Sequence, residues 1–377
     1  MSSSSLLGSS SSASHPLAPY GWDDVWADAF APYAGRGLLP GRVVRVDRGR
    51  CDVITPVGTV HADTEFVTPH DPLRVVCTGD WVAVDPGGDP QYARAVLPRR
   101  TAFVRSTSSQ RSEGQILAAN VDHAVVCVSL AVEPDLGRIE RFLALAWESG
   151  ANPLVVLTKA DLVPDPTGLS YLVQDVETVA PGVPVLPVSA TTGEGMEVLT
   201  AILAGGTGVL LGVSGAGKST LANRLLGEEV MDVGATRETD GKGRHTTTTR
   251  NLLVMPGGGV LIDTPGVRGV GLWDAGNGVG QVFAEIEDLA ADCRFHDCAH
   301  EAEPGCAVLA AVEDGSLHER RLDSYRKLLR ENRRIVAKTD ARLRADSPTP
   351  GTRWPARRPS PPSGSWPRRR WSRTRPT

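Results

Sequence analysis

The sequence predicts a multidomain protein of the α/β class, built from three successive segments with different hydrophobic patterns. Short apolar runs separated by Gly, Pro and Asp fill residues 36–100, which is typical of a small β-barrel. Strand-like runs alternate with helical spacing over residues 101–275, which predicts a mainly parallel sheet covered by helices on both faces. A cysteine and histidine cluster, followed by a helical pattern, occupies residues 276–343.

The length and charge of the chain limit its organisation and its class. A chain of 377 residues is long enough for two or three domains, each with its own core. The formal net charge of −4 argues by itself against a nucleic-acid-binding protein. No run approaches the roughly 18 apolar residues that a membrane-spanning helix needs. We expect a disordered or irregular serine-rich extension over 1–35 and a disordered, arginine-rich tail over 344–377.

The first segment has the turn and strand signals of a small barrel. An Asp-Arg-Gly turn separates two of its strand-like runs, and the runs are Gly41–Val46, Cys51–Ile54, Trp81–Val84 and Ala93–Leu97. About five short strands in this space suit a Greek-key barrel of the OB type, although other small barrels fit the pattern. Such barrels commonly bind RNA. Four arginines could meet phosphates there or form plain solvated surface: Arg42, Arg45, Arg48 and Arg50.

The second segment begins with a β-α unit. A connector rich in Arg and Ser over 99–113 leads to Val121–Val128, which predicts a buried strand. Within Leu136–Ser149, apolar residues recur at helical spacing, which predicts a helix. Because ligands of parallel sheets bind at the carboxyl ends of the strands, residues directly after each strand are candidate site residues.

Two such loops predict a site for guanine. Thr158-Lys159-Ala160-Asp161 follows the strand-like run Pro153–Leu157. The Asp161 carboxylate can accept from guanine N1–H and the 2-amino group together, and unpaired polar groups can reject a wrong base by about 10⁴-fold. Lys159 can lay its aliphatic stem along the base. The usual motif has Asn where Thr158 stands, so the side-chain amide that would tether the loop or contact the base is absent.

The dipeptide Ser189-Ala190 follows Val183–Leu186 and would complete the base-reading site, although a dipeptide alone carries almost no information. Together with Asp161, it favours GTP over ATP as the ligand. An ATPase is the weaker alternative, and it requires that nucleotide choice not depend on Asp161.

A phosphate loop is the strongest single match. Gly212–Ser219 fits G-x-x-x-x-G-K-[ST] between an apolar strand, Gly208–Leu211, and the helical run Thr220–Leu226. Lys218 should neutralise phosphate charge as a catalytic residue, and Ser219 should ligate Mg²⁺. A chance match in a glycine-rich turn is the alternative. The predicted phosphate-binding residues are Gly212, Val213, Ser214, Gly215, Ala216, Gly217, Lys218, Ser219 and Thr220.

The two remaining motifs concern Mg²⁺ and the attacking water. Asp263-Thr264-Pro265-Gly266 follows the strand-like run Gly259–Ile262, and we expect Asp263 to hold Mg²⁺ and the Gly266 N–H to contact the γ-phosphate. Val267 stands where many such enzymes have the glutamine that orients water. His245, a bound partner or a backbone group must therefore place the water, although a loop histidine can also be merely solvated. We expect one of Thr246, Thr247 and Thr248 to ligate Mg²⁺ in the GTP state, and Thr247 is the candidate that we choose.

The order of these motifs is informative. An ordinary Ras-like domain has its phosphate loop first and its base-reading loops last, whereas here Asp161 and Ser189 precede Gly212–Ser219. The same site can be built from either order if the old termini are joined and new ones open elsewhere. The sequence therefore predicts a circularly permuted Ras-like P-loop GTPase domain that converts GTP to GDP and phosphate.

A second cluster has metal-ligand spacing. Cys293, Cys298, His300 and Cys306 supply three thiolates and one imidazole, the ligand set of one structural Zn²⁺ in a helical domain. His296 is a rival ligand that spacing does not exclude. Disulfide pairing is the alternative, but a chain whose start does not resemble an export signal belongs in a reducing compartment. We expect the remaining cysteines to be small buried apolar residues: Cys51, Cys77 and Cys127.

Taken together, the permuted motif order, the Gly-Arg-His-Thr-Thr-Thr run and the cysteine–histidine cluster resemble the ribosome small subunit-dependent GTPase A family over roughly residues 36–340. The resemblance implies an N-terminal OB-fold, a permuted GTPase domain and a C-terminal zinc-binding helical domain. It also implies association with the small ribosomal subunit and its rRNA during late maturation, with hydrolysis stimulated there. We expect a cytoplasmic monomer that binds GTP and GDP and does not contact membranes.

A basic amphipathic helix follows the cysteine cluster. Its apolar residues lie at helical spacing between Leu317 and Leu329, and its polar side carries basic residues, among them Arg320, Arg321 and Arg330. This side could bind RNA phosphates or form a solvated face paired with neighbouring acids. A nucleotide-gated rRNA-binding scaffold with little intrinsic hydrolysis therefore stays as the alternative function, and Val267 makes it plausible.

Overall fold

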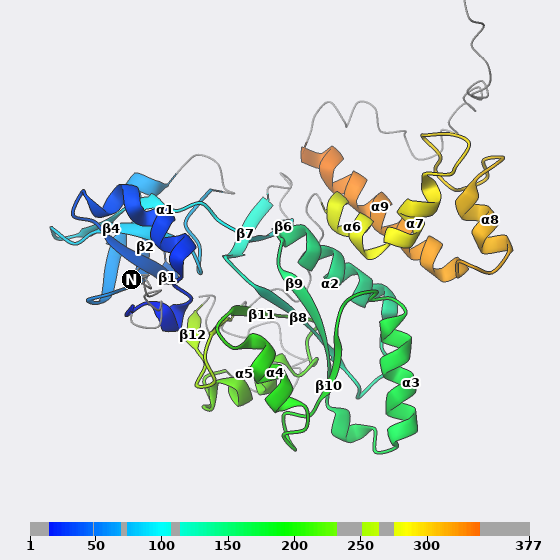
Figure 1. Cartoon of the computed structure of the whole chain (residues 1–377), viewed down its shortest axis with the longest axis horizontal. Helices are drawn as coiled ribbons and strands as arrows, with labels where there is room; N and C mark the ends of the chain where they lie inside the picture. Colours follow the sequence, from blue (N-terminus) through cyan, green and yellow to red (C-terminus); the bar gives the residue numbers. More distant parts are fainter. Residues whose placement is uncertain are drawn as a thin grey trace, which may run out of the picture.

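The computed structural model describes residues 15–47, 49–68, 74–106, 114–231, 251–263 and 275–339. Figure 1 shows these residues in three neighbouring parts: a β-rich part at the N-terminal end, a central sheet flanked by helices, and a helical part after it. This arrangement confirms the predicted multidomain α/β class. None of the helices in the described ranges is long and apolar enough to cross a membrane.

The N-terminal part is a closed five-stranded barrel, as predicted for an OB-type fold. Its strands pair in the order β1-β2-β3-β5-β4, and β1 closes the barrel against β4. The strands are β1 (Leu39–Asp47), β2 (Arg50–Thr55), β3 (Gly58–Asp63), β4 (Trp81–Asp85) and β5 (Gln91–Val96). Alternate residues of β4 face opposite sides, so that Val82 and Val84 pack inside the barrel while Trp81 and Ala83 pack outside it.

A helix covers the outer side of this barrel, where the sequence predicts a disordered or irregular extension over 1–35. The helix is α1 (Asp24–Ala34), and the Asp23 carboxylate caps it by accepting from the Trp26 N–H at 2.9 Å. Trp26 and Phe30 lie one turn apart on this helix, and together with Trp22, which precedes it, they pack in one cluster with Trp81. The prediction is therefore wrong for this helix, because its apolar stripe buries aromatic surface on the barrel. Residues 1–14 lie outside the described ranges.

The central sheet has six strands in the order β10-β9-β8-β11-β13-β12. Its strands are β8 (His123–Ser129), β9 (Asn152–Thr158), β10 (Val185–Val188), β11 (Thr207–Leu211), β12 (Leu252–Val254) and β13 (Val260–Ile262). All neighbours are parallel except β12 and β13. A hairpin of β6 (Ala102–Ser106) and β7 (Gly114–Ala119) precedes the sheet, so part of the predicted connector over 99–113 is a strand instead.

Helices cover both faces of the sheet, because its central strands are apolar on both sides. On β8, Ala124 and Val126 face the core that contains α2, whereas Val125 and Cys127 face the core of α4 and α5. The helices are α2 (Leu136–Ser149), α3 (Pro166–Glu177), α4 (Met196–Leu203) and α5 (Lys218–Leu226). The predicted helix over Leu136–Ser149 is confirmed at both ends.

The helical part packs directly against α2. It contains α6 (Gly276–Val282), α7 (Ala284–Ala290), α8 (Ala307–Glu313) and α9 (Glu319–Thr339), and its core is continuous with that of the sheet. At the crossing of α6 and α2, a Cβ added to Gly278 would lie 2.0 Å from the Ala144 carbonyl oxygen. Only glycine permits this close approach, so the crossing fixes α6 on the sheet domain.

A buried ion network joins the same two parts. Glu140 on α2 is fully buried and accepts from Arg321 at 2.7 Å, from Arg320 at 2.9 Å and from the Ser324 hydroxyl. The Arg321 guanidinium also donates to Glu285 at 2.8 Å and lies over the Phe283 ring. Arg320 and Arg321 are therefore interdomain partners of Glu140, whereas Lys327, Arg330, Arg333 and Arg334 are exposed on α9.

A second buried guanidinium joins the barrel to the sheet. Arg42 on β1 is 1% exposed and donates to the Asn120 carbonyl at 3.0 Å and to the hydroxyl of Thr207, the first residue of β11, at 2.8 Å. Burial lowers the pKa of Arg42 to about 10, while Asp122 and Asp80 oppose that shift. The interpretation of Arg42 as an RNA-facing residue is therefore wrong, because its side chain is enclosed between two domains.

The Glu140 network predicts a local loss of stability. Glu140→Ala leaves Arg321 buried with less compensation, and removing one partner of a buried pair costs about 3 kcal/mol or more. Hydrogen exchange measures the free energy of opening at each amide. We expect this free energy to fall by that amount at the α9 amides, while the barrel amides keep their protection. Glu177→Ala on the exposed face of α3 is the matched control. Unchanged α9 protection in Glu140→Ala would show that the network does not hold the helical part in place.

Candidate nucleotide and metal sites

The strand order places four loops at one edge of the sheet. From β8 the chain proceeds outward through β9 and β10, then returns to β11 on the other side of β8. The direction of winding therefore reverses between β8 and β11, and ligands of open parallel sheets bind at such a switch point, beyond the carboxyl ends of the strands. The base-reading motifs follow β9 and β10, the phosphate loop follows β11, and Asp263 follows β13.

The phosphate loop has the backbone that its glycines permit. Gly212, Gly215 and Gly217 all have positive φ, and a Cβ on Gly212 would lie 2.6 Å from the Cys127 carbonyl oxygen. Helix α5 begins at Lys218, so its first N–H groups face the loop, an arrangement that favours anions. The Lys218 ammonium donates to the carbonyls of Gly212 at 2.8 Å and Val213 at 2.6 Å.

The first base-reading loop is bonded directly to the phosphate loop. The Thr158 hydroxyl donates to the Ala216 carbonyl at 2.8 Å, and the Lys159 ammonium donates to the Gly215 carbonyl at 3.0 Å. Thr158 is buried, and Lys159 has the left-handed conformation, with φ of 60°. The structure thus brings together two motifs that are more than fifty residues apart in the sequence.

The second base-reading loop holds the Asp161 carboxylate. The Ser189 hydroxyl is fully buried and donates to Asp161 Oδ1 at 2.6 Å, while Ser189 Oγ accepts from the Thr192 N–H at 3.1 Å. Asp161 itself is exposed, and a carboxylate with one such bond keeps further capacity to accept from a ligand. Ala160 is buried and Ala190 is half-buried beside these two residues in the sequence.

The predicted magnesium ligands are only partly within the described residues. Asp263 follows β13 directly, and its N–H donates to the Asn251 carbonyl at 2.9 Å. Burial raises the pKa of Asp263, so this carboxyl becomes neutral at a higher pH than an exposed Asp and would be lost earlier as a metal ligand in acid. Ser219 is half-buried in the first turn of α5. Thr247, His245, Gly266 and Val267 lie outside the described residues.

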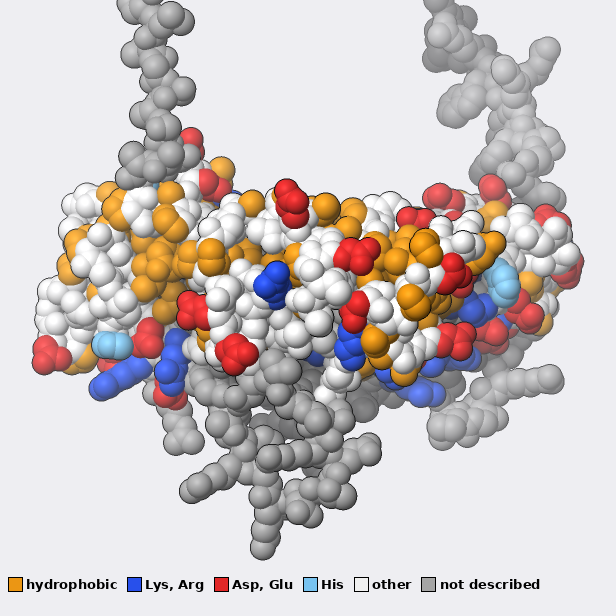
Figure 2. All heavy atoms as spheres, turned by 90° about the horizontal axis from the view of Figure 1, so that it is seen from below, with side chains coloured by type: hydrophobic (Ala, Val, Ile, Leu, Met, Phe, Trp, Pro, Cys, Tyr) orange, Lys and Arg blue, Asp and Glu red, His pale blue; other side chains and the backbone are white. Residues whose placement is uncertain are grey.

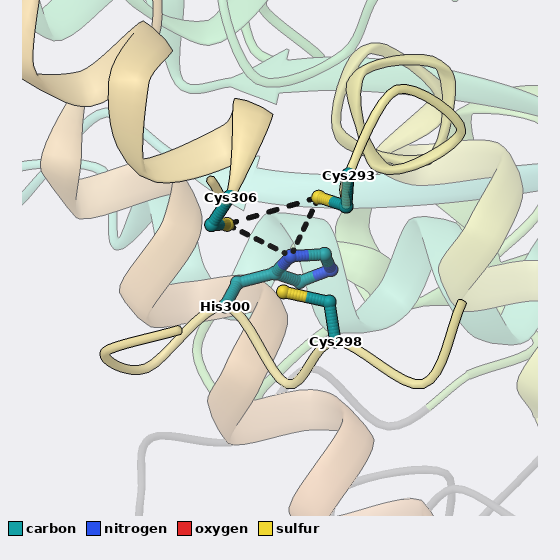
Figure 3. Close-up of side chains that lie close together, drawn as sticks. All are labelled: Cys293, Cys298, His300 and Cys306. Carbon is teal, nitrogen blue, oxygen red and sulfur yellow. Dashed lines mark hydrogen bonds between the residues drawn. The ribbon is translucent and has the colours of Figure 1, made fainter. Parts of the chain in front are cut away.

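The cysteine–histidine cluster has the dimensions of a metal site. The four ligand atoms of Cys293, Cys298, His300 and Cys306 all lie within 4.8 Å of one another, and Figure 3 shows them pointing toward a common centre. Cys293 Sγ lies 3.8 Å from Cys306 Sγ and 3.7 Å from His300 Nδ1. Ligands about 2.3 Å from a tetrahedral ion are separated by about 3.8 Å, so this cluster could hold such an ion.

The loop around the cluster is ordered by a carboxylate that no sequence motif predicts. Glu303 accepts from the N–H groups of Ala299, Glu301 and Ala302 at 2.8 to 3.0 Å. Burial lowers the pKa of His300, which favours the neutral imidazole that binds metals. The rival ligand His296 is outside the cluster, with 93% of its side chain exposed. No sequence signal marks Glu303, because its partners are backbone groups.

The fold and these loops define a circularly permuted P-loop GTPase with a cysteine–histidine cluster that could hold a metal ion. A family profile described as RsgA GTPase matches residues 96–273. The chain is 79% identical over 346 residues to a protein of Streptomyces avermitilis, covering 92% of this chain and 94% of the relative, which is named small ribosomal subunit biogenesis GTPase RsgA. A protein of Opitutus terrae with the same name is 42% identical, covering 86% of this chain and 92% of that relative. The chain belongs to the RsgA GTPase family.

Solved structures agree with this assignment. The crystal structure of YjeQ from Thermotoga maritima is 28% identical, with a TM-score of 0.58, and covers 78% of this chain and 98% of that protein. The structure of YloQ, described as a circularly permuted GTPase, is 22% identical, with a TM-score of 0.57, covering 79% of this chain and 96% of that protein. This second likeness supports the fold alone.

The cluster geometry predicts which side chains would hold the zinc ion that the sequence predicts. Cys298→Ser replaces one thiolate of a four-ligand set, so we expect purified protein to lose most of its bound zinc, from about one ion per chain in the wild type. His296→Asn is the matched control, and it should keep its zinc because His296 is exposed and outside the cluster. Elemental analysis measures both. Loss of zinc from His296→Asn would contradict the assigned ligand set.

Proposed function

We propose that this chain binds the small ribosomal subunit and hydrolyses GTP to GDP and phosphate during late maturation of that subunit in the cytoplasm. The name of its curated relatives supports this role, since they are called small ribosomal subunit biogenesis GTPases. The bond from Thr158 to Ala216 is the structural observation that carries the nucleotide part of the proposal. It joins the loop that would read guanine to the loop that would hold the phosphates.

Within this proposal, each residue has a chemical role. Asp161 accepts from the guanine N1–H and 2-amino group, with Ser189 fixing its carboxylate. Lys218 exchanges its present carbonyl partners for phosphate oxygens, because a charged acceptor binds an ammonium more strongly than a neutral carbonyl. Ser219, Asp263 and Thr247 would hold Mg²⁺, which neutralises charge on the phosphates when it is bound.

The water that attacks the γ-phosphate needs a positioning group, and Val267 cannot supply one because its side chain has no polar atom. We propose that His245 holds this water and that the Gly266 N–H contacts the γ-phosphate. Both residues lie outside the described ranges, so their roles rest on the sequence pattern. A group donated by the ribosomal subunit is the alternative source of catalysis.

The two flanking domains are proposed to supply the RNA contacts. We assign zinc to the metal cluster as a structural ion, because three thiolates and one imidazole leave no open coordination position. The exposed residues Arg45 and Arg50 on the barrel and Lys327 and Arg330 on α9 are available for phosphates. On the face drawn in Figure 2, basic and acidic side chains are intermixed. On this face, the mixture favours RNA contacts at separate points over one continuous basic patch.

A second candidate is a nucleotide-gated rRNA-binding scaffold that hardly hydrolyses GTP. The observation that favours it is Val267 in place of the usual glutamine. In either case, we propose that bound GTP fixes the flanking domains in an RNA-binding arrangement, since the segment after Asp263 leads directly into the metal-binding part.

Hydrolysis measured with and without small ribosomal subunits separates these candidates. We expect GTP turnover to rise by at least about 10-fold when subunits are added, because stimulation by a group supplied in trans is typically larger than this. Lys218→Ala should abolish the stimulated rate. Intact GTP binding with no turnover in either condition would favour the scaffold and contradict the enzymatic role.

Replacement of Asp161 tests base recognition. Asp161→Asn removes the carboxylate acceptor for two donors, and two charge-assisted hydrogen bonds of about 1.5–3 kcal/mol each correspond to a loss of roughly 10²- to 10⁴-fold in GDP affinity. Asp175→Asn on the exposed side of α3 is the control and should bind GDP as the wild type does. Equal affinities of Asp161→Asn and wild type for GDP would overturn the guanine site and favour the ATPase interpretation.

A further inference from the structure

The hydroxyl hydrogen of Thr158 is already donated to a group within the protein. Its oxygen lies 2.8 Å from the Ala216 carbonyl oxygen and 3.3 Å from the Val128 carbonyl oxygen, and the residue is only 4% exposed. A threonine hydroxyl carries a single hydrogen, so it can donate fully to only one acceptor at a time. Both neighbouring acceptors are main-chain carbonyls, and the shorter contact belongs to the phosphate loop.

An asparagine at this position, as in the usual motif, has different capacity. Its amide nitrogen carries two hydrogens, so one can bond the phosphate-loop carbonyl while the other remains for a ligand. Guanine N7 is an acceptor and requires a donor. Thr158 keeps the tether to Ala216 but has no second hydrogen for N7.

The close packing of the two loops shows that the tether is built into the fold. A Cβ added to Gly217 would lie 3.3 Å from Thr158 Oγ1, so the phosphate-loop backbone already contacts this side chain. Lys159 adds a second link from its ammonium to the Gly215 carbonyl. Displacing the Thr158 hydroxyl toward a base would leave the buried Ala216 carbonyl without this donor, which is costly.

We propose that Thr158 is a positioning residue that ties the base-reading loop to the phosphate loop, and that its side chain leaves guanine N7 unread. This inference rests on the proposed function, because it concerns the same guanine site. Base selection then depends on the opposite edge of guanine, where the N1–H and the 2-amino group donate to the Asp161 carboxylate. Nucleotide affinity therefore changes little when N7 of guanine is replaced by C–H.

Affinities for GDP and 7-deaza-GDP, which has C–H in place of N7, test this directly. We expect wild-type protein to bind both within about twofold, whereas Thr158→Asn should prefer GDP by roughly two- to tenfold, the value of one neutral hydrogen bond. A wild-type preference for GDP of fivefold or more would overturn the proposal. An equal penalty for the analogue in wild type and Thr158→Asn would overturn it as well.

The tether has its own matched pair of variants. Thr158→Val keeps the shape of the side chain but removes the hydroxyl, so it should weaken GDP and 7-deaza-GDP equally, by about tenfold. Thr158→Ser keeps the donor and should restore most of the affinity for both ligands. If Thr158→Val binds GDP as tightly as the wild type does, the positioning role is overturned. It is also overturned if Thr158→Ser loses as much GDP affinity as Thr158→Val.

A comparison of ADP with GDP separates failure of this inference from failure of the proposed function. If wild-type protein binds ADP as tightly as GDP, the guanine site itself is wrong. If it prefers GDP over ADP and also rejects 7-deaza-GDP, the guanine site stands and only the unread N7 is overturned.

Discussion

The parallel pairing of β11 with β8 on one side and β13 on the other is the constraint on which the nucleotide site depends. It aligns the carboxyl ends of strands that lie far apart in the sequence, so that the loops after them meet at one edge. The bond from Thr158 to Ala216 then fixes the two main loops relative to each other. Chain order is unimportant to this geometry, which is why a permuted sequence can build the same site as an unpermuted one.

Two buried arginines extend this rigidity to the neighbouring domains. Arg42 contacts Thr207 at the start of β11, and Arg321 contacts Glu140 on α2, which packs on the sheet. Buried ion pairs contribute little net stability compared with apolar packing, but an unpaired buried charge is expensive. If either domain moved away from the sheet, its arginine would lose these partners, at a cost in free energy.

The sequence predicts the elements that carry strong local signals. The phosphate loop, the strand before Thr158 and the helix over Leu136–Ser149 are where the motifs and apolar spacing indicate, and Cys51, Cys77 and Cys127 are buried as expected. Arg42 could not be assigned from its strand, because a row of arginines looks the same whether it faces solvent or a second domain. The pairing of Arg320 and Arg321 could not be predicted for the same reason, since their partner Glu140 is far away in the sequence. Helix α1 was predictable, because its aromatic residues already have helical spacing.

We propose that one nucleotide spans the two tethered loops. A crystal structure of the chain with GDP and Mg²⁺ tests it most directly. We expect Lys218 to leave the Gly212 carbonyl for the diphosphate, the guanine edge to lie on Asp161, and the Thr158–Ala216 bond to persist. A diphosphate in the phosphate loop with its guanine directed away from Asp161 would show that the two tethered loops do not form one nucleotide site.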